Sequence, residues 1–343
     1  RFRFALQHPV DLSEVHYLIY HGRVHSQRVY LEPGPFFYEL KSEKPLGAIV
    51  GDSETVFRLF APRAKWVKVG FFMPGETEEA IHWVLMERSE DFVWETMVPR
   101  ELTGAYYWFR LDGPEGACSL FDPKFKILDP YAKAAESREG PGIVVDDRGY
   151  SALPAFHPVA WQDLVTMEAH TRDLVAGLPE YRDVSRPLGF ADLERYVKSD
   201  QFYPKSLGAN ALELQPVQEN DSQSYGEYHW GYMTANFFSP ASSYASDPKS
   251  GSQVEEFRSL VTRLHAREMS VILDVVYNHV GEPAHLMYID KLYYFHLEQD
   301  GTPVNWSGCG NDLRCAAPMV RRIIVESLKH FALFYGVDGF RFD

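Results

Sequence analysis

The last eight residues of the chain, Gly336 to Asp343, contain an arginine and an acid two positions apart. The segment reads as a β-strand, in which alternate side chains point the same way, so we expect Arg341 and Asp343 to lie side by side. A guanidinium beside a carboxylate keeps the carboxylate ionised and fixes its orientation. A carboxylate nucleophile needs both properties, and such chemistry usually takes a second carboxyl group. We therefore predict that Asp343 is a nucleophile supported by Arg341.

A second polar group lies in the apolar segment SVILDVVYNHV, which begins at Ser270. In an extended strand Asp274 and Asn278 would share a face, and His279 would lie at the strand's end. Taken alone, an Asp and an Asn at a strand end could simply cap the following loop. The DGFRFD segment on the next expected strand favours a functional site instead.

The chain divides into two parts with different patterns of apolar and polar residues. Residues from about 45 to 120 form short runs of alternating apolar and polar residues separated by Gly, Pro and Asp, which predicts a small β-sandwich. After about residue 160, strands that begin near Leu164, Ala209, Ser270 and Gly336 alternate with helical patterns. This alternation predicts parallel βαβ units, arranged in a doubly wound sheet or an eight-stranded barrel.

The barrel is the favoured arrangement for two reasons. No glycine-rich phosphate loop follows the first strand, which counts against a nucleotide-binding sheet. Polar residues gather at the carboxyl ends of the third and fourth strands, where barrel enzymes place their sites.

The clearest helix is expected after residue 252. Ser252 and Glu255 have the spacing of a capping box, in which each side chain satisfies a free backbone N–H. An apolar stripe at helical spacing follows, made of Val254, Phe257, Leu260, Val261 and Leu264.

Composition limits the partners. The net charge is −14 and no basic cluster is visible, which argues against nucleic acid and against an anionic membrane and suits a neutral substrate. No apolar run approaches the 18 residues typical of a membrane span. Three cysteines form no disulfide framework, and free thiols lean only weakly toward the cytoplasm, so the compartment and the oligomeric state stay open. The chain begins at Arg1, so a processed or missing start is expected.

Five segments together carry a resemblance to a known family. DVVYNHV, followed by GVDGFRFD, resembles the first and second signature regions of the α-amylase family of glycoside hydrolases. HWGYMTANFFSPASSYA, from His229, and NWSGCGNDL, from Asn305, look like loops of its isoamylase, glycogen-debranching and pullulanase branch. The all-β segment followed by LDPYAKA resembles the immunoglobulin-like glucan-binding module that precedes the barrel in these enzymes.

The resemblance implies a domain organisation. Residues 1–40 are an unassigned amino-terminal segment, and residues 41–125 are an all-β, immunoglobulin-like glucan-binding module. Residues 126–160 form a linker. Residues 161–343 are the first half, about four βα units, of a catalytic (β/α)8 TIM barrel that is truncated after its fourth strand.

The resemblance also implies roles for four residues. Asp343 matches the nucleophile that forms a glycosyl–enzyme ester, and Arg341 matches the partner that keeps it ionised. His279 matches a hydrogen-bond donor to the glucose unit that is cleaved, and Tyr232 matches the ring stacked on that glucose. Packing alone is the alternative for Tyr232 and His279.

Asp274 and Asn278 match residues that stiffen the site. In some relatives the asparagine position also helps to hold calcium, but no acid cluster accompanies it here, so we expect no metal and no cofactor.

The implied activity is retaining hydrolysis of α-glucosidic bonds in glycogen, starch or pullulan, with α-1,6 branch bonds favoured. The family's general acid, which follows the fifth strand, is expected to be absent, so this piece alone should be inactive and prone to aggregate. Alternatives are an α-1,4-acting amylase, a branching transferase, or a non-catalytic α-glucan-binding protein.

Overall fold

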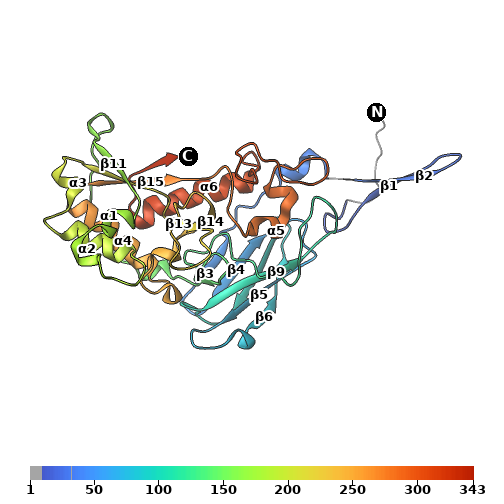
Figure 1. The fold of residues 1–343 in the computed structure, drawn as a ribbon. Coiled ribbons are helices and arrows are strands. Elements are labelled where there is room, and N and C mark those ends of the chain that lie inside the picture. Colours follow the sequence, from blue (N-terminus) through green and yellow to red (C-terminus); the bar gives the residue numbers. More distant parts are fainter. Residues whose placement is uncertain (1–9, 32) are drawn as a thin grey trace.

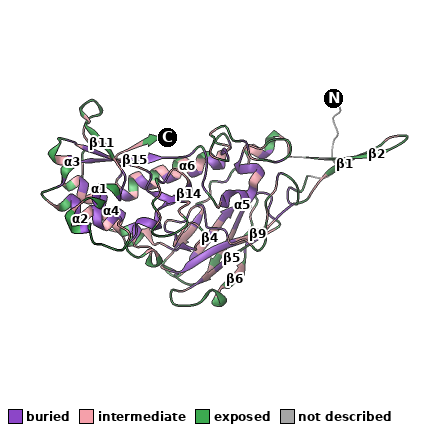
Figure 2. Cartoon of the chain, in the orientation of Figure 1, coloured by how far each residue is buried: buried purple, intermediate pink, exposed green. Residues whose placement is uncertain are grey.

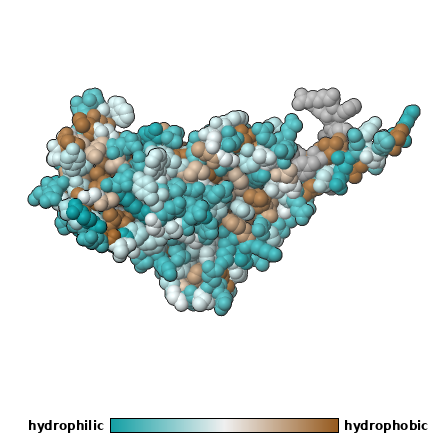
Figure 3. All heavy atoms as spheres, viewed as in Figure 1, coloured by the Kyte–Doolittle hydropathy of each residue, from teal (hydrophilic) through white to brown (hydrophobic). Residues whose placement is uncertain are grey.

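A computed structural model describes residues 10–31 and 33–343 of the chain. The described chain begins with a two-stranded antiparallel hairpin, β1 (Tyr17–His21) and β2 (Ser26–Tyr30), which projects from the body of the molecule (Figure 1). Every residue of β1 is exposed, so the hairpin packs little against the rest (Figure 2). Apolar side chains are visible along its surface (Figure 3). The short helix η1 (Pro35–Glu39) leads from it into the module.

The module consists of two four-stranded antiparallel sheets that pack face to face. One sheet has the order β3-β4-β8-β7 and the other β10-β9-β5-β6. Their bounds are β3 (Gly47–Val50), β4 (Thr55–Phe60), β5 (Trp66–Phe72), β6 (His82–Leu85), β7 (Glu87–Arg88), β8 (Val93–Val98), β9 (Tyr106–Asp112) and β10 (Gly142–Ile143). Phe57, Val69 and Phe109, one from each of three strands, are fully buried between the sheets.

The segment expected to be a linker also belongs partly to the module. Ile127 exchanges backbone hydrogen bonds with Phe109, and β10, at Gly142–Ile143, extends the sheet beside β9. The chain between residues 126 and 143 is therefore tied to the module through backbone pairing.

The second part of the chain is built on a parallel sheet. Its strands are β11 (Thr166–Ala169), β12 (Ala211–Leu214), β15 (Ser270–Val275) and β16 (Gly339–Phe342), and they lie side by side in chain order. A doubly wound sheet reverses its strand order at a switch point, whereas a barrel adds each strand beside the previous one. The absence of a reversal among the described strands supports the barrel, and the predicted sandwich followed by four barrel strands is confirmed.

Helices cover one face of this sheet. The main ones are α2 (Phe190–Lys198), α4 (Gln253–Ala266) and α6 (Pro318–His330). A π-helical turn, η8 (Phe331–Tyr335), directly follows α6. Leu212, Leu214, Val271 and Leu273 alternate toward these helices and are fully buried. The smaller elements are α1 (Asp173–Ala176), α3 (Tyr203–Ser206), α5 (His285–Tyr294), the hairpin β13 (Gln218–Asn220) with β14 (Thr234–Pro240), and the 3-10 turns η2 (Glu78–Ala80), η3 (Asp147–Gly149), η4 (Trp161–Asp163), η5 (Pro179–Tyr181), η6 (Ser242–Tyr244) and η7 (Pro248–Ser250).

The start of α4 differs from the sequence-based prediction. The apolar stripe is buried as predicted, but Ser252 makes no side-chain cap. Its hydroxyl accepts a hydrogen bond from the backbone N–H of Asp247 at 3.0 Å instead, so the predicted capping box is wrong. The preceding turn η7 competes for the same hydroxyl.

Buried polar contacts join the module to the barrel part. Arg63, in the module, donates to Asp290 of α5 at 2.9 Å, and both side chains are almost completely buried. His285, the first residue of α5, accepts a hydrogen bond from Leu128 N and donates to Arg138 O. Among the described residues, no helix is long and apolar enough to cross a membrane.

Candidate active site

The predicted pair at the end of β16 is formed. Arg341 Nη1 donates to Asp343 Oδ1 at 2.6 Å, as the alternation of side chains in a strand requires. The same nitrogen lies 3.1 Å and 3.2 Å from the two carboxylate oxygens of Asp274 on the neighbouring strand β15. Asp274 is buried, whereas the side chains of Arg341 and Asp343 are 47% and 39% exposed. The guanidinium therefore joins an interior acid to an accessible one, and these acids raise the pKa of Arg341 above its usual value.

Strand register explains why these groups meet. Arg341 lies directly opposite Asp274, and Glu213 lies opposite Ile272, two positions before Asp274. Glu168 of β11 lies opposite Glu213 of β12. Because side chains alternate, these polar residues occupy the face of the sheet that the helices do not cover. Burial, followed by repulsion from Asp274 and Glu168, raises the pKa of Glu213.

Tyr232 reaches the same site from the loop between β13 and β14. Its hydroxyl donates to Asp274 Oδ2 at 2.7 Å, and its backbone oxygen lies 2.9 Å from His279 Nε2. Burial is the main reason that the pKa of Tyr232 is raised, and its hydrogen bond to Asp274 adds to the effect. The ring is half-buried, which leaves part of it accessible for stacking.

The ring nitrogens of His279 are not free to donate to a ligand. It is 2% exposed, its Nε2 faces the oxygen of Tyr232, and its Nδ1 lies 2.8 Å from Asn278 Oδ1. Both ring nitrogens are engaged within the chain, so its role in donating to a sugar stays a prediction. In the structure, His279 connects the loop after β15 to the loop that carries Tyr232.

The six residues predicted for the site are therefore connected through direct contacts. The set is Asp343, Arg341, Asp274, Tyr232, His279 and Asn278. Asn278 is exposed, and its side-chain oxygen contacts His279. Within residues 10–31 and 33–343, no group of three or more His, Cys, Asp or Glu is placed to hold a metal ion. The expectation that no metal binds at Asn278 stays a prediction, and we derive no step through calcium.

Sequence reasoning missed several residues of this face. Glu168 and Glu213 follow from the alternation rule, had it been applied to the first two strands as well as to the last two. Trp230, two positions before Tyr232, is 61% exposed, and Trp306 is 77% exposed in a loop whose Leu313 N–H donates to Asn278 O. Exposed indole rings beside the site are candidate platforms for sugar rings.

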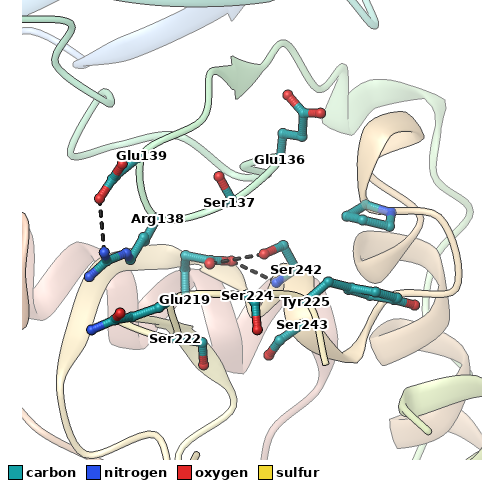
Figure 4. A pocket seen from close by; sticks show the side chains of 12 residues that line it. Glu136, Ser137, Arg138, Glu139, Glu219, Ser222, Ser224, Tyr225, Ser242 and Ser243 are labelled. Atoms are coloured by element: carbon teal, nitrogen blue, oxygen red, sulfur yellow. Dashed lines mark hydrogen bonds and ion pairs between the residues drawn. The ribbon is translucent and has the colours of Figure 1, made fainter. Parts of the chain in front are cut away.

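A separate polar cavity of about 130 Å³ lies between the loop at 136–139 and the residues after β13 and β14 (Figure 4). At its floor, Glu219 accepts hydrogen bonds from the backbone N–H and the hydroxyl of Ser242. Burial raises the pKa of Glu219 to about 7. Glu136 lies at the same cavity and points away from Glu219 (Figure 4).

The fold and the site resemble one class of protein: an α-amylase-type catalytic barrel preceded by a carbohydrate-binding module. Residues 45–132 match carbohydrate-binding module 48, the isoamylase N-terminal domain. Residues 197–306 match the α-amylase catalytic domain. The second match includes Tyr232, Asp274, Asn278 and His279, while Arg341 and Asp343 lie beyond it.

Similar individual proteins show which branch of the α-amylase family the chain resembles. The chain is 32% identical to the chloroplastic isoamylase 3 of Oryza sativa subsp. japonica, over 90% of this chain and 45% of that protein. It is 33% identical to the glycogen debranching enzyme of Serratia proteamaculans, over 87% of this chain and 50% of that protein. A pullulanase of Paenibacillus barengoltzii, solved with maltohexaose and α-cyclodextrin, superposes with a TM-score of 0.79 at 27% identity, covering 92% of this chain and 51% of that one.

These matches confirm the resemblance to the isoamylase and pullulanase branch of the α-amylase family. The chain spans about half the length of the relatives it matches.

Proposed function

We propose that this chain carries the nucleophile side of a retaining glycoside hydrolase that cleaves α-1,6 branch bonds in an α-glucan. The observation that carries the proposal is the Arg341 contact to both Asp274 and Asp343 at the carboxyl ends of adjacent barrel strands. Barrel enzymes place catalytic groups at this edge. The names of the similar proteins, an isoamylase and a glycogen debranching enzyme, support the substrate class.

The chemistry assigned to these residues is a double displacement. A carboxylate oxygen of Asp343 attacks the anomeric carbon and forms an ester, while the bond from that carbon to the leaving oxygen breaks. A second carboxylic acid gives its proton to the leaving oxygen, and water later hydrolyses the ester. We assign no residue of this chain to that second acid.

Each remaining residue has a defined part in this proposal. Arg341 holds the carboxylate of Asp343 in its orientation, and Asp274 fixes both the guanidinium and the hydroxyl of Tyr232. The accessible part of the Tyr232 ring stacks on the sugar, and His279 holds the backbone of that loop.

The partner we propose is a neutral α-glucan, in keeping with the net charge of −14, which disfavours nucleic acid and anionic membranes. The weak lean toward the cytoplasm stays a prediction, since the similar rice enzyme is named chloroplastic. Calcium is not part of the proposal.

The test replaces the nucleophile in the protein that contains this chain. Asp343→Asn should lower kcat on pullulan by a factor of at least about 10³, because the amide cannot form the ester. Reducing ends released from pullulan, glycogen and amylose measure both the loss and the preference among bonds. Glu136→Gln, at the separate cavity, is the matched carboxylate-to-amide control and should leave the rate unchanged.

A covalent trap separates the proposed mechanism from its alternatives. An activated fluoroglycoside should add one sugar mass to the peptide that contains Asp343, as read by mass spectrometry. Faster release from amylose than from pullulan would favour an α-1,4 enzyme. Tight glucan binding without turnover would favour a binding protein.

A further inference from the structure

The turn that presents Tyr232 is fastened by a histidine and an acid. His229 Nε2 lies 2.8 Å from Asp221 Oδ1, and the two side chains are 22% and 17% exposed. Asp221 comes directly after β13, and its backbone N–H donates to Met233 O at 2.9 Å. The backbone contact with Met233 thus holds Asp221 at the end of the turn. His229, at the start of the turn, contacts the same acid through its side chain.

The other ring nitrogen closes the turn. His229 Nδ1 accepts a hydrogen bond from Gly231 N at 2.8 Å. This bond from a side chain to the N–H two residues later is the geometry of an Asx-turn, with an imidazole in place of the usual oxygen. Gly231 has φ +91°, and a Cβ there would lie 2.5 Å from Pro216 O, so only glycine fits the turn without strain.

These two contacts select one form of the imidazole. A backbone N–H can only donate, so Nδ1 must carry a lone pair, and a neutral ring then carries its proton on Nε2, the atom that lies 2.8 Å from Asp221 Oδ1. A doubly protonated ring would keep its contact with Asp221 but could no longer accept from Gly231. The closed turn therefore requires neutral His229.

The turn leads directly to the candidate active site. Tyr232 follows Gly231, and it is the residue whose hydroxyl contacts Asp274 and whose carbonyl contacts His279. On the opposite side, His170 Nε2 lies 3.0 Å from the backbone oxygen of His229. The start of the turn is thus held by His170 and Asp221, and its end by the site.

We propose that His229 is a positioning residue that latches the turn His229–Tyr232 and so orients the Tyr232 ring for the glucan. This inference rests on the proposed function, because that function supplies the glucan on which the Tyr232 ring stacks.

The charged and titratable groups around the latch come from two segments. Asp221 contacts the ring from the end of β13. From the segment after β11 come His170, Arg172 and Asp173, and Asp173 accepts a hydrogen bond from the hydroxyl of Tyr228.

Two replacements of His229 distinguish a latch from general packing. His229→Leu removes the acceptor and should raise KM for pullulan about fivefold near pH 7.5, with kcat changed less, because one hydrogen bond that positions a binding ring is lost. His229→Asn supplies an Asx-turn oxygen that accepts from Gly231 and does not titrate, so it should rescue the affinity lost in the leucine variant.

The rescue by asparagine is the decisive comparison, measured in the protein that contains this chain. A wild-type KM in His229→Leu, or a KM in His229→Asn as high as in His229→Leu, would overturn the proposal.

A readout independent of turnover separates the latch from the proposed function. In ¹⁵N-histidine NMR, the signals missing from His229→Asn identify His229, and they should report an Nε2–H tautomer near pH 7.5. An Nδ1–H tautomer would overturn the latch. A wild-type protein that cleaves no glucan, but shows this tautomer and a Tyr232 ring signal shifted in His229→Leu and not in His229→Asn, would overturn the proposed function while supporting the latch.

Discussion

A single nitrogen of Arg341 contacts two carboxylates, and this residue-scale feature organises the site. The partner two positions away, Asp343, follows from strand alternation, whereas Asp274 comes from a neighbouring strand 67 residues earlier in the chain. The buried acid fixes the guanidinium, and the guanidinium aims the exposed acid. Charge-assisted hydrogen bonds of this kind combine strength with orientation.

Glu219 gives a prediction at the same scale. Its ordinary pKa is 4.5 and its folded value is about 7, so the folded state binds the extra proton between those pH values. Stability should therefore fall as pH rises through this window, by up to about 3 kcal/mol. In urea unfolding from pH 4.5 to 8, Glu219→Gln should gain stability relative to the wild type as pH rises.

Glu136, a half-buried acid at the same cavity, provides the control for this experiment. Glu136→Gln makes the same chemical change and should run parallel to the wild type at every pH. Parallel curves for Glu219→Gln and the wild type would show that burial of Glu219 does not cost stability.

At the scale of elements, α5 is the contact between the module and the loop that carries His279. Its first residue, His285, is fully buried between Leu128 N and Arg138 O, and its ring packs near Phe125. Tyr288, one turn later, stacks on Phe125 at 3.8 Å between ring centroids. The position of α5 is thus set by the segment that follows β9.

Acid should weaken this contact. Burial lowers the pKa of His285 from 6.5 to about 4, so the unfolded state binds more protons between these values. Stability should be lost as pH falls through that window, by up to about 3 kcal/mol. His285→Gln should show a shallower loss in urea unfolding at pH 4 to 7, whereas the exposed variant His157→Gln should retain the wild-type slope. Identical slopes for His285→Gln and the wild type would contradict the assignment.

At the scale of the whole molecule, the module and the barrel part share buried contacts rather than a flexible joint. Arg63 donates to Asp290, Ser119 and the backbone of Cys118, all at 3.1 Å or less. Tyr293 and Tyr294 of α5 donate to the backbone oxygens of Leu40, directly before the module, and of Phe60 in the module. We infer that the two parts unfold as one cooperative unit.

Breaking the ion pair tests this inference. Arg63→Met should lower the free energy of unfolding by about 3–5 kcal/mol, because it removes the cation paired with the buried Asp290 carboxylate and leaves that carboxylate only the backbone N–H of Tyr293. The double variant Arg63→Met with Asp290→Leu should recover much of that loss, since no charge remains buried. Scanning calorimetry of the wild type should show one transition, and two resolved transitions would mean that the parts fold separately.

The sequence was sufficient wherever the pattern is local. Period-two alternation placed Arg341 beside Asp343, and the period of 3.6 identified the buried face of α4. The same local reasoning failed at Ser252, because its hydroxyl had a competing partner in the turn before the helix. A capping box needs only the right residue types in sequence, but its formation depends on what the preceding chain offers.

The sequence by itself determined the order of the main elements, the faces they bury and the contact between Arg341 and Asp343, since each depends on residues a few positions apart. Only the tertiary structure decided that Asp274 shares the guanidinium of Arg341, that Tyr232 is held by His279, and that Asp290 receives Arg63. These contacts join residues 47 to 227 positions apart in the chain. Their geometry is set by strand register and by the packing of the module on α5, neither of which leaves a periodic mark in the sequence.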